Sequence, residues 1–398
     1  MHRISRRSFV AVAASAALAS SLALLPSAGA AEEVEHHAAG HVYVLNNNLS
    51  GQNSITVFAR AHDGALRQVG STPIGGLGSL AAFADGTQGS LISTANGQRL
   101  FAVDAGSDQI SVVDVEDGEL DLVGVFPSGG AGPVSLTFDD GLLYVLNAAN
   151  ANPAAAANVA GFRVDRKGHL TPIPGATRPL SSAHPNPAQV LLDPQHRFLL
   201  VTEKGTNLID VYRVAHDGSL SAPTSMPSVG NTPFGMAFSH DGSRPELVVA
   251  DAGTPPTFIG AATAYRLVDG QLQLINGPVP DHQIAPCWMI ITRDGRFAYT
   301  SNADSQSISG YRIQHDGTIS LLDANGVTGT TPADTFPLEE ALTHNSRFLY
   351  VLDSRLLLTP PGPATLSGFR IGHDGHLTQV VDPAQITLPF SAIGLATD

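Results

Sequence analysis

The chain has 398 residues, of which 43% are hydrophobic and only 14% are charged, with 40 glycines and 27 prolines. This composition is typical of a globular protein rich in strands and turns, and it excludes a disordered chain. The formal net charge of −14 disfavours nucleic acid or an anionic membrane surface as a partner. Because Cys287 is the only cysteine, an intramolecular disulfide framework is also excluded.

The N-terminal residues have the features of an export signal. A basic start with "SRRSFV" precedes an apolar run over residues 9–25 and a small-residue stretch, "AGA", that ends at Ala30. We expect cleavage after Ala30, a flexible segment over residues 31–40, and no integral membrane segment once this signal peptide (residues 1–30) is removed. The pair Arg6 and Arg7 resembles the twin-arginine signal for folded export, so we predict a secreted, extracytoplasmic protein.

From residue 41 onward, one hairpin pattern recurs along the chain. "VFARAHDGAL", "VYRVAHDGSL", "GYRIQHDGTI" and "GFRIGHDGHL" each place a turn between two apolar runs. The turn glycines follow one another at about 50 residues, as expected for propeller blades. They are Gly64, Gly118, Gly168, Gly218, Gly270, Gly317 and Gly375. Such turns lie at the surface, and we therefore expect exposed turn residues, not catalytic ones, at four histidines. These are His62, His216, His315 and His373.

The repeats predict the architecture. Residues 187–227 resolve into four short alternating apolar runs separated by turn residues, which is the pattern of a four-stranded antiparallel sheet. The first unit, beginning "HVYVLNNN", has only three such runs, whereas "FSAIGLATD" at the C-terminus is a lone one. We predict an all-β, seven-bladed β-propeller over residues 41–398, closed by the C-terminal strand joining the N-terminal blade. The Gly-rich segment 74–84 has no assigned place in this pattern.

Inner turns such as "RDGRFAYTSN" and outer hairpins such as "GYRIQHDGTISLL" resemble the lactonase family of seven-bladed propellers. That family includes propeller-type 6-phosphogluconolactonases and carboxymuconate-lactonizing enzymes, and the resemblance covers almost all of the mature chain. It implies a small lactone as the substrate, opened by a carboxylic ester hydrolase or formed by a lactonizing cycloisomerase.

The resemblance also implies three catalytic motifs, an "HxHS"-like start of one inner strand, an "RH" pair at the next, and an "NE" end of that blade's second strand. The matching positions here hold Asn186 and Ala188, then Phe234 and Gly235, then Asp251. Only a carboxylate is shared with the family pattern, so lactone chemistry would need a different set of groups.

Propeller geometry predicts where such groups meet. The start of each inner strand and the loop between the second and third strands lie at the same end of the channel, where a ligand reaches them first. Glu203 and Lys204 in "VTEKGTN" belong to this end, with Asp251 one blade away. We expect Glu203 or Asp251 as the base that activates water and Lys204 as the stabiliser of the oxyanion. An ion pair between Glu203 and Lys204 is the structural alternative, and His184 is a further candidate base.

The same end of the channel supplies the candidate substrate-binding residues. They are Gln189, Phe234, Trp288, Asn302 and Asn147. Trp288 can stack on a sugar or lactone ring, and the adjacent Cys287 is interpreted as a packed small residue. The chain has no phosphate-binding loop, zinc-ligand spacing or nucleophile elbow, so we predict neither a cofactor nor a metal.

A second class of function would use the same channel mouth. A non-catalytic extracellular binding module for a carbohydrate or protein ligand would have an aromatic-lined rim with ordinary carboxylates. An enzyme would instead place a strongly perturbed carboxylate or histidine beside convergent donors. Both classes stay open on the sequence alone.

Overall fold

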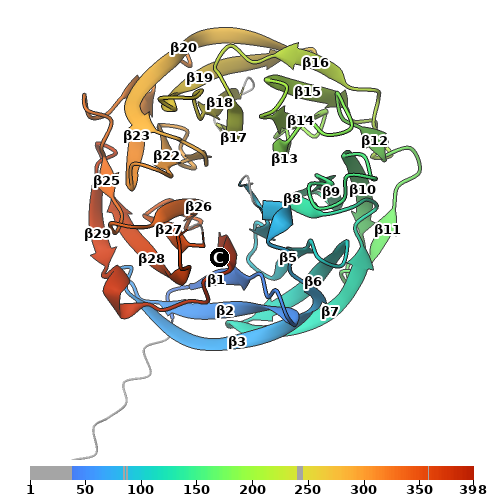
Figure 1. The fold of residues 1–398 in the computed structure, drawn as a ribbon, viewed down its shortest axis with the longest axis horizontal. Coiled ribbons are helices and arrows are strands. Elements are labelled where there is room, and N and C mark those ends of the chain that lie inside the picture. Colours follow the sequence, from blue (N-terminus) through green and yellow to red (C-terminus); the bar gives the residue numbers. More distant parts are fainter. Residues whose placement is uncertain (1–37, 84–85, 87, 240–244, 357) are drawn as a thin grey trace, which may run out of the picture. The chain divides into compact units, whose positions relative to one another are not determined.

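Short alternating apolar runs, each ended by a turn, fold into seven antiparallel sheets arranged around a central channel (Figure 1). The computed structural model describes residues 38–83, 86, 88–239, 245–356 and 358–398. Six blades are built from consecutive strands, and in the remaining blade the C-terminal strand β30 pairs with β1. The predicted seven-bladed propeller and its mode of closure are therefore confirmed. The predicted signal peptide and residues 31–37 of the 31–40 segment lie outside the described residues.

The strands occupy equivalent positions from blade to blade. The inner strands are β30 (Ala392–Thr397), β4 (Leu91–Ser93), β8 (Pro133–Asp139), β13 (Pro187–Leu192), β17 (Pro233–Phe238), β21 (Ile290–Ile291) and β26 (Phe336–Leu342). The second strands are β1 (His41–Asn46), β5 (Arg99–Asp104), β9 (Leu142–Asn147), β14 (Phe198–Glu203), β18 (Glu246–Asp251), β22 (Phe297–Asn302) and β27 (Phe348–Arg355).

The outer half of each blade is less uniform. The third strands are β2 (Gln52–Arg60), β6 (Gln109–Glu116), β10 (Asn158–Val164), β15 (Leu208–Arg213), β19 (Ile259–Val268), β23 (Ser307–Ile313) and β28 (Gly362–Ile371). The fourth strands are β3 (Leu66–Leu77), β7 (Glu119–Pro127), β11 (Leu170–Pro172), β16 (Thr224–Pro227), β20 (Gln271–Ile284), β24 (Ile319–Leu321) and β29 (Leu377–Val381). Two blades carry an additional short strand, β12 (Arg178–Pro179) or β25 (Gly329–Thr330).

The recurring turn glycines connect neighbouring blades. Gly375 has φ +92°, and a Cβ there would lie 2.5 Å from the Phe297 ring of the preceding blade, so only glycine fits. The Tyr299 hydroxyl donates to the Gly375 carbonyl at 2.7 Å, and Tyr350 does the same to Gly64 at 2.8 Å. The hairpin therefore recurs because each turn packs on the second strand of the neighbouring blade. The histidines of these turns are exposed as predicted, at His62, His216, His315 and His373.

The second strands are buried on both faces because each lies between two blades. In β1, Val42 and Val44 pack in one hydrophobic cluster, and Tyr43 and Leu45 pack in another. Successive side chains of a strand alternate between its two faces. Whether a residue occupies an odd or an even position along a second strand therefore decides which adjacent blade its side chain contacts. This determines where the predicted site residues point.

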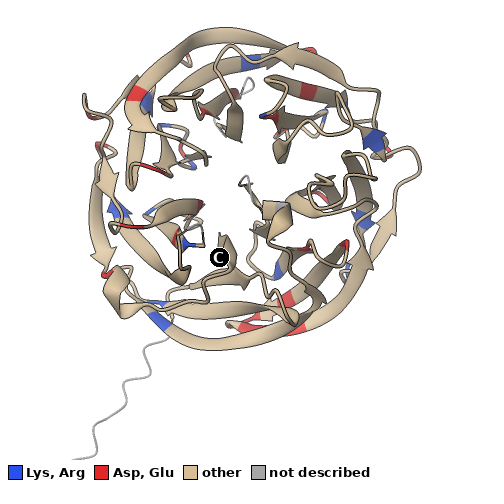
Figure 2. Ribbon diagram, in the orientation of Figure 1, with Lys and Arg blue, Asp and Glu red and all other residues tan. Residues whose placement is uncertain are grey.

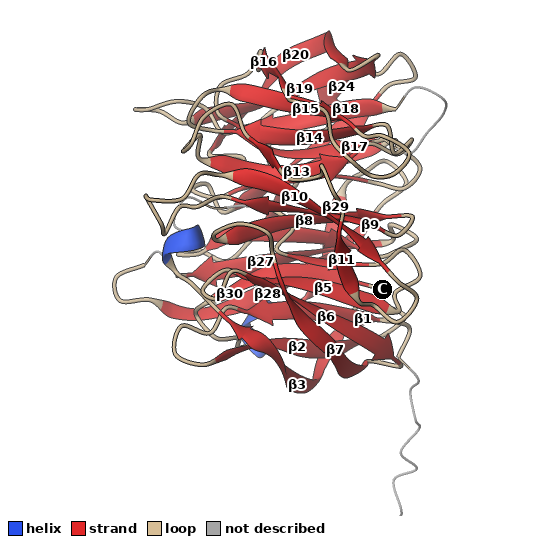
Figure 3. Ribbon diagram, turned by 90° about the vertical axis from the view of Figure 1, so that its right-hand side faces the viewer, coloured by secondary structure: helices blue, strands red, loops and turns tan. Residues whose placement is uncertain are grey.

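Strands form nearly all of the regular structure (Figure 3). The described helical segments are two single 3₁₀ turns, η1 (Ala81–Phe83) and η2 (Pro383–Gln385). No helix among the described residues is long and apolar enough to span a membrane. Lysine, arginine, aspartate and glutamate colour only a small part of the ribbon in Figure 2, as the low charged fraction predicts.

Candidate functional site

The first end of the channel, where the inner strands begin, is crossed by the connection from β3 to β4. Gln88 of this connection makes two hydrogen bonds with the Met289 backbone, from its Nε2 to the carbonyl at 2.8 Å and from the Met289 N–H to its Oε1 at 3.0 Å. The Gln88 N–H donates to the Ala188 carbonyl at 3.2 Å. Figure 1 shows η1 of the same connection beside the central opening. The Gly-rich segment without an assigned place is therefore the end of β3 and the start of this crossing.

Four side chains gather beneath the crossing, and we call Lys204, Phe234, Trp288 and Glu339 the mouth cluster. The Lys204 ammonium lies 4.5 Å from the centroid of the Phe234 ring and donates to the Gly86 carbonyl at 2.6 Å. The Phe234 and Trp288 rings are 5.3 Å apart between centroids. The mouth cluster therefore places a cation and two aromatic rings together where the sequence predicted ligand contacts.

Glu339 supplies the carboxylate of the mouth cluster. Its Oε1 accepts the Gly89 N–H at 2.6 Å, its Oε2 accepts the Ser90 hydroxyl at 3.2 Å, and the Trp288 side chain also hydrogen-bonds to it. Burial nevertheless raises the pKa of Glu339 to about 8, because the hydrogen bonds only partly offset the loss of hydration. A carboxyl group with this pKa exchanges its proton near neutral pH, as an acid–base group requires.

Glu203, the first predicted base, does not point at the channel. It is fully buried, and its oxygens accept hydrogen bonds from the Ser181 N–H at 3.0 Å, the Ser181 hydroxyl, and the Thr206 hydroxyl at 2.5 Å. Leu199, Val201 and Glu203 occupy alternate positions of β14, so their side chains lie on the same face of the strand. Leu199 and Val201 pack toward the preceding blade, where Ser181 also lies. Glu203 and Lys204 are adjacent in sequence but have different partners: Glu203 accepts from Ser181 and Thr206, and Lys204 donates to the Gly86 carbonyl.

Asp251, the second predicted base, is also enclosed. It accepts the Thr263 hydroxyl at 2.5 Å within its own blade, and burial raises its pKa to about 8. A Cβ on Gly230 would lie 1.9 Å from the Asp251 carboxyl carbon, so the chain that leaves the preceding blade covers this carboxylate closely. The structure therefore does not bring Asp251 and Glu203 together, and each faces the blade before its own.

These two carboxylates belong to a position that repeats around the ring. A polar residue at or near the end of each second strand is buried, and in five blades it pairs with a hydroxyl of the third strand. The pairs are Asn46–Thr56, Asp104–Ser111, Asp251–Thr263, Asn302–Ser309 and Asp353–Ser367, at 2.5–2.9 Å. Asn147 instead bonds to Asn158 at 3.0 Å. The predicted binding residues Asn147 and Asn302 therefore lie between strands of their own blades.

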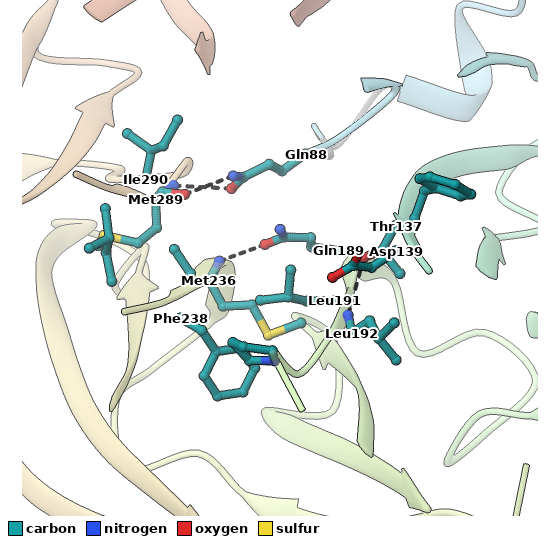
Figure 4. A pocket seen from close by; sticks show the side chains of 14 residues that line it. Gln88, Thr137, Asp139, Gln189, Leu191, Leu192, Met236, Phe238, Met289 and Ile290 are labelled. Atoms are coloured by element: carbon teal, nitrogen blue, oxygen red, sulfur yellow. Dashed lines mark hydrogen bonds between the residues drawn. The ribbon is translucent and has the colours of Figure 1, made fainter. Parts of the chain in front are cut away.

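Gln189 faces the channel, as the prediction for an inner-strand residue requires. Its Oε1 accepts the Met236 N–H at 2.6 Å, which ties two neighbouring inner strands together. A cavity of about 420 Å³ extends from Gln88 and Gln189 to Asp139 and Phe238 near the opposite end of the channel. Figure 4 shows the two amide side chains with their methionine partners in this cavity.

The remaining candidates lie at the first end without joining the mouth cluster. His184 is exposed in the connection that leads to β13. Cys287 packs with Phe234 and Trp288, its thiol contacts the Ala285 carbonyl at 3.1 Å, and burial raises its pKa to about 12. The thiol is therefore protonated at neutral pH and serves in packing, as interpreted from the sequence.

The crossing also fills space that the family motif would use. Gly235 stands where the family has the second residue of its "RH" pair, and a Cβ at Gly235 would lie 2.1 Å from Gln88 Oε1. No larger side chain fits there while Gln88 holds Met289. A catalytic group at this mouth must therefore come from another strand, and Glu339 on β26 is such a group.

Two residues of the site were missed as site candidates at the sequence level. Gln88 lies in an irregular connection that gives no periodic signal. Glu339 had a signal, because the doublet Glu339–Glu340 places two carboxyl groups in an inner strand whose other residues are apolar. Among the described residues, no group of three or more histidine, cysteine or carboxylate side chains is arranged to hold a metal ion.

Comparison with known proteins agrees with this geometry. A family model described as a seven-bladed β-propeller lactonase matches residues 83–252. A putative 6-phosphogluconolactonase from Bacteroides fragilis superposes with a TM-score of 0.62 at 17% identity, covering 90% of this chain and 98% of the other. A periplasmic gluconolactonase from Pseudomonas aeruginosa gives 0.63 at 17% identity, covering 90% and 99%. A protein from Lactobacillus plantarum gives 0.66 at 18% identity, with coverage of 90% and 99%.

No curated protein sequence matches the chain. At the identities of the solved structures, the likeness concerns the fold. Together, the match over residues 83–252 and the superpositions confirm the predicted resemblance, and the chain is a lactonase-like seven-bladed β-propeller.

Proposed function

We propose that the protein is an exported lactonase that opens a small lactone at the first end of its channel. The observation that carries this proposal is the mouth cluster, in which a carboxyl group with a raised pKa, an ammonium group and two aromatic rings come together at the first end of the channel. Titratable groups shifted toward neutral pH beside convergent donors are typical of catalytic sites. The fold shared with gluconolactonases supports the choice of substrate class.

The reaction follows from the chemistry of these groups. Glu339 takes a proton from water as the water oxygen bonds to the lactone carbonyl carbon, and Lys204 stabilises the negative charge on the carbonyl oxygen. The ring C–O bond then breaks, and Glu339 returns the proton to the departing ring oxygen. The product is the open hydroxy acid, and Trp288 and Phe234 hold the ring during both steps.

A pH-stat assay of lactone hydrolysis by the mature protein tests this proposal. Glu339→Gln keeps the size of the side chain but removes the proton acceptor, and we expect a loss of about 100-fold or more in kcat. Glu340→Gln is the matched control, because Glu340 is the neighbouring buried carboxyl and its oxygens have no hydrogen-bond partner among the described residues. Loss of activity in both variants, or in neither, would contradict the assignment of Glu339.

Glu203→Gln and Asp251→Asn belong in the same assay because both residues were predicted as bases. If Glu339 is the base, these two variants keep turnover when they fold. Turnover lost in Glu203→Gln or Asp251→Asn, and kept in Glu339→Gln, would instead assign the chemistry to the carboxylates between the blades.

The second candidate function is non-catalytic binding at the same mouth. It is favoured by the hydrogen bonds that Glu339 already makes, because its two carboxyl oxygens accept from the Gly89 N–H and the Ser90 hydroxyl. A ligand would then stack on Phe234 and Trp288 without being turned over. The absence of hydrolysis across a broad lactone panel, together with quenching of Trp288 fluorescence by a carbohydrate, would favour binding over catalysis.

A further inference from the structure

The two ends of the channel differ in their charged residues. At the first end, the described ends of second strands, the loops after them and the connections between blades contain three Lys or Arg residues, Arg178, Lys204 and Arg355. Lys204 already donates to the Gly86 carbonyl and lies over the Phe234 ring. Arg355 donates to the Asp334 carbonyl at 3.3 Å. Arg178 likewise donates to the Leu220 carbonyl at 2.8 Å. Of these three cations, Lys204 is therefore the one that belongs to the mouth cluster.

The turns of the second end have the opposite character. Arg293, Arg296 and Arg347 line one hollow between neighbouring turns there, together with Asp294. An ordinary phosphate-binding site uses several such donors, because a buried phosphate without paired cations pays a large desolvation cost. The mouth cluster lies at the other end of the channel, so these arginines are not available to a ligand there.

The first end of the channel also carries exposed apolar side chains. Eight large apolar residues of its loops and strand ends are between 39% and 55% exposed. They are Leu49, Leu77, Leu80, Val229, Phe258, Ile259, Ile284 and Phe390. Ile259 and Ile284 are paired across β19 and β20, and Leu77 and Leu80 flank the start of the crossing. The two aromatic rings of the mouth cluster, Phe234 and Trp288, belong to a hydrophobic cluster with Cys287, and Leu338 packs against it.

We propose that the substrate is a neutral lactone with an apolar substituent, and that phosphorylated sugar lactones are not substrates. This inference rests on the proposed function, since it names the substrate class of the same site. The lactone ring lies against Phe234 and Trp288, and the substituent lies along the apolar residues of the first end. Each methylene group that leaves water on these surfaces strengthens binding by about fourfold.

A substrate series tests this assignment. The probes are γ-butyrolactone, γ-octalactone and γ-decalactone, compared with glucono-δ-lactone and its 6-phosphate. We expect kcat/KM to rise with the alkyl chain, by up to about fourfold per methylene, and the phosphorylated sugar lactone to be the poorest substrate. A preference for the phosphorylated lactone would overturn the substrate class and leave the proposed hydrolysis standing.

Substitutions at two exposed residues test where the apolar substituent of the lactone lies. Ile259→Ser removes an apolar side chain that is 55% exposed at the first end, and Val69→Ser is the matched control on the outer strand β3, where Val69 is 45% exposed. We expect Ile259→Ser to lower kcat/KM for γ-decalactone several-fold without changing that for γ-butyrolactone. The same loss in Val69→Ser, or no loss in Ile259→Ser, would contradict the placement of the substituent.

The fluorescence of Trp288, the only tryptophan, separates binding from turnover. Quenching by γ-decalactone without hydrolysis would support the apolar ligand and overturn the proposed hydrolysis. Neither quenching nor hydrolysis with any of the five lactones would overturn both.

Discussion

His41 and Asp398, 357 positions apart, are joined by two hydrogen bonds at the seam of the ring. The His41 N–H donates to Oδ1 at 2.6 Å, and the imidazole Nδ1 lies 2.9 Å from Oδ2. The Tyr43 hydroxyl also donates to Oδ2 at 3.2 Å. The Asp398 side chain therefore fastens β30 to β1, in addition to the backbone bonds between these strands.

Asp398→Asn should weaken this closure at neutral pH and have much less effect in acid. Burial alone would raise the pKa of Asp398, but the hydrogen bonds from His41 and Tyr43 outweigh it and lower the pKa below its ordinary value. A lowered carboxyl pKa stabilises the fold above the ordinary value, and this stabilisation is lost as the pH falls through the folded value. We expect Asp398→Asn to cost about 1–3 kcal/mol at pH 7 and much less under strongly acidic conditions.

Thermal unfolding at several pH values measures this effect. Asp121→Asn is the control, because Asp121 is an exposed carboxylate of the outer strand β7. A destabilisation of Asp398→Asn that is equal at every pH, or is matched by Asp121→Asn, would show that the carboxylate does not fasten the seam.

The turn glycines predict a second difference in stability. Gly375→Ala introduces a side chain at φ +92° and places it 2.5 Å from the Phe297 ring, whereas Gly141→Ala has φ +75° and a nearest neighbour at 3.6 Å. Both variants carry the backbone strain of a left-handed residue, but only Gly375→Ala also overlaps with another blade. We expect a loss of about 1–2 kcal/mol for Gly141→Ala and about 2–5 kcal/mol for Gly375→Ala, measured by denaturant unfolding. Equal losses would mean that the blade contact adjusts without cost.

The fold was predictable because its signals are local and repeated. Each blade specifies its own hairpins through alternating apolar residues and turn glycines, and the incomplete first unit showed that the C-terminal strand had to complete it. The contact between Gly375 and Phe297 could not be read from the sequence, because it joins residues of different blades. The repeat nevertheless indicated that the turn glycine served a purpose common to all blades.

The candidate site was only partly predictable, for two physical reasons. Glu203 and Lys204 are neighbours in sequence, but alternate side chains of an extended chain point in opposite directions, so Glu203 contacts Ser181 and Lys204 contacts the mouth. The crossing by Gln88 depends on contacts with Met289 and Ala188, which are distant in the sequence. Periodicity predicts the position of a strand and not the path of an irregular connection.

One blade departs from the polar pairing of the others, and this predicts a pH-dependent stability. Where five blades pair the second strand with a hydroxyl, this blade has Asp210 close to Glu203. Burial, with a further contribution from Glu203, raises the pKa of Asp210 to about 7. A raised carboxyl pKa means that stability is lost as the pH rises from the ordinary value to the folded value.

Asp210→Ser places a hydroxyl at the third-strand position that Ser111, Ser309 and Ser367 occupy in other blades. We expect it to stabilise the protein by about 1–3 kcal/mol at pH 8 relative to its effect at pH 5, because it removes a buried carboxyl group that must ionise beside Glu203. Thermal unfolding at pH 5 and pH 8 makes the comparison. The same shift at both pH values would show that the pKa of Asp210 is not raised in the folded protein.

The proposed export route gives a prediction for the leader, residues 1–30. Replacing Arg6 and Arg7 by lysine keeps the charge but removes the twin-arginine pattern, so we expect a reporter fused to the leader to remain in the cytoplasm. Arg3→Lys is the matched control and should leave export intact. Export that continues in the double variant, or in cells without the twin-arginine machinery, would contradict this route.

The last prediction follows from the raised pKa of Glu339, which has opposite consequences for activity and stability. As the pH rises toward 8 and above, Glu339 ionises and becomes a proton acceptor, so hydrolysis should accelerate. The same ionisation places a charge in a buried site, and the contribution of Glu339 to folding stability is therefore lost from the ordinary carboxyl value up to about 8. Glu339→Gln should remove both trends, giving little activity at any pH and a smaller decrease in stability between pH 6 and pH 9. An activity profile of Glu339→Gln that still rises through pH 8 would assign the proton acceptor to another group, even if the stability profile changed as expected.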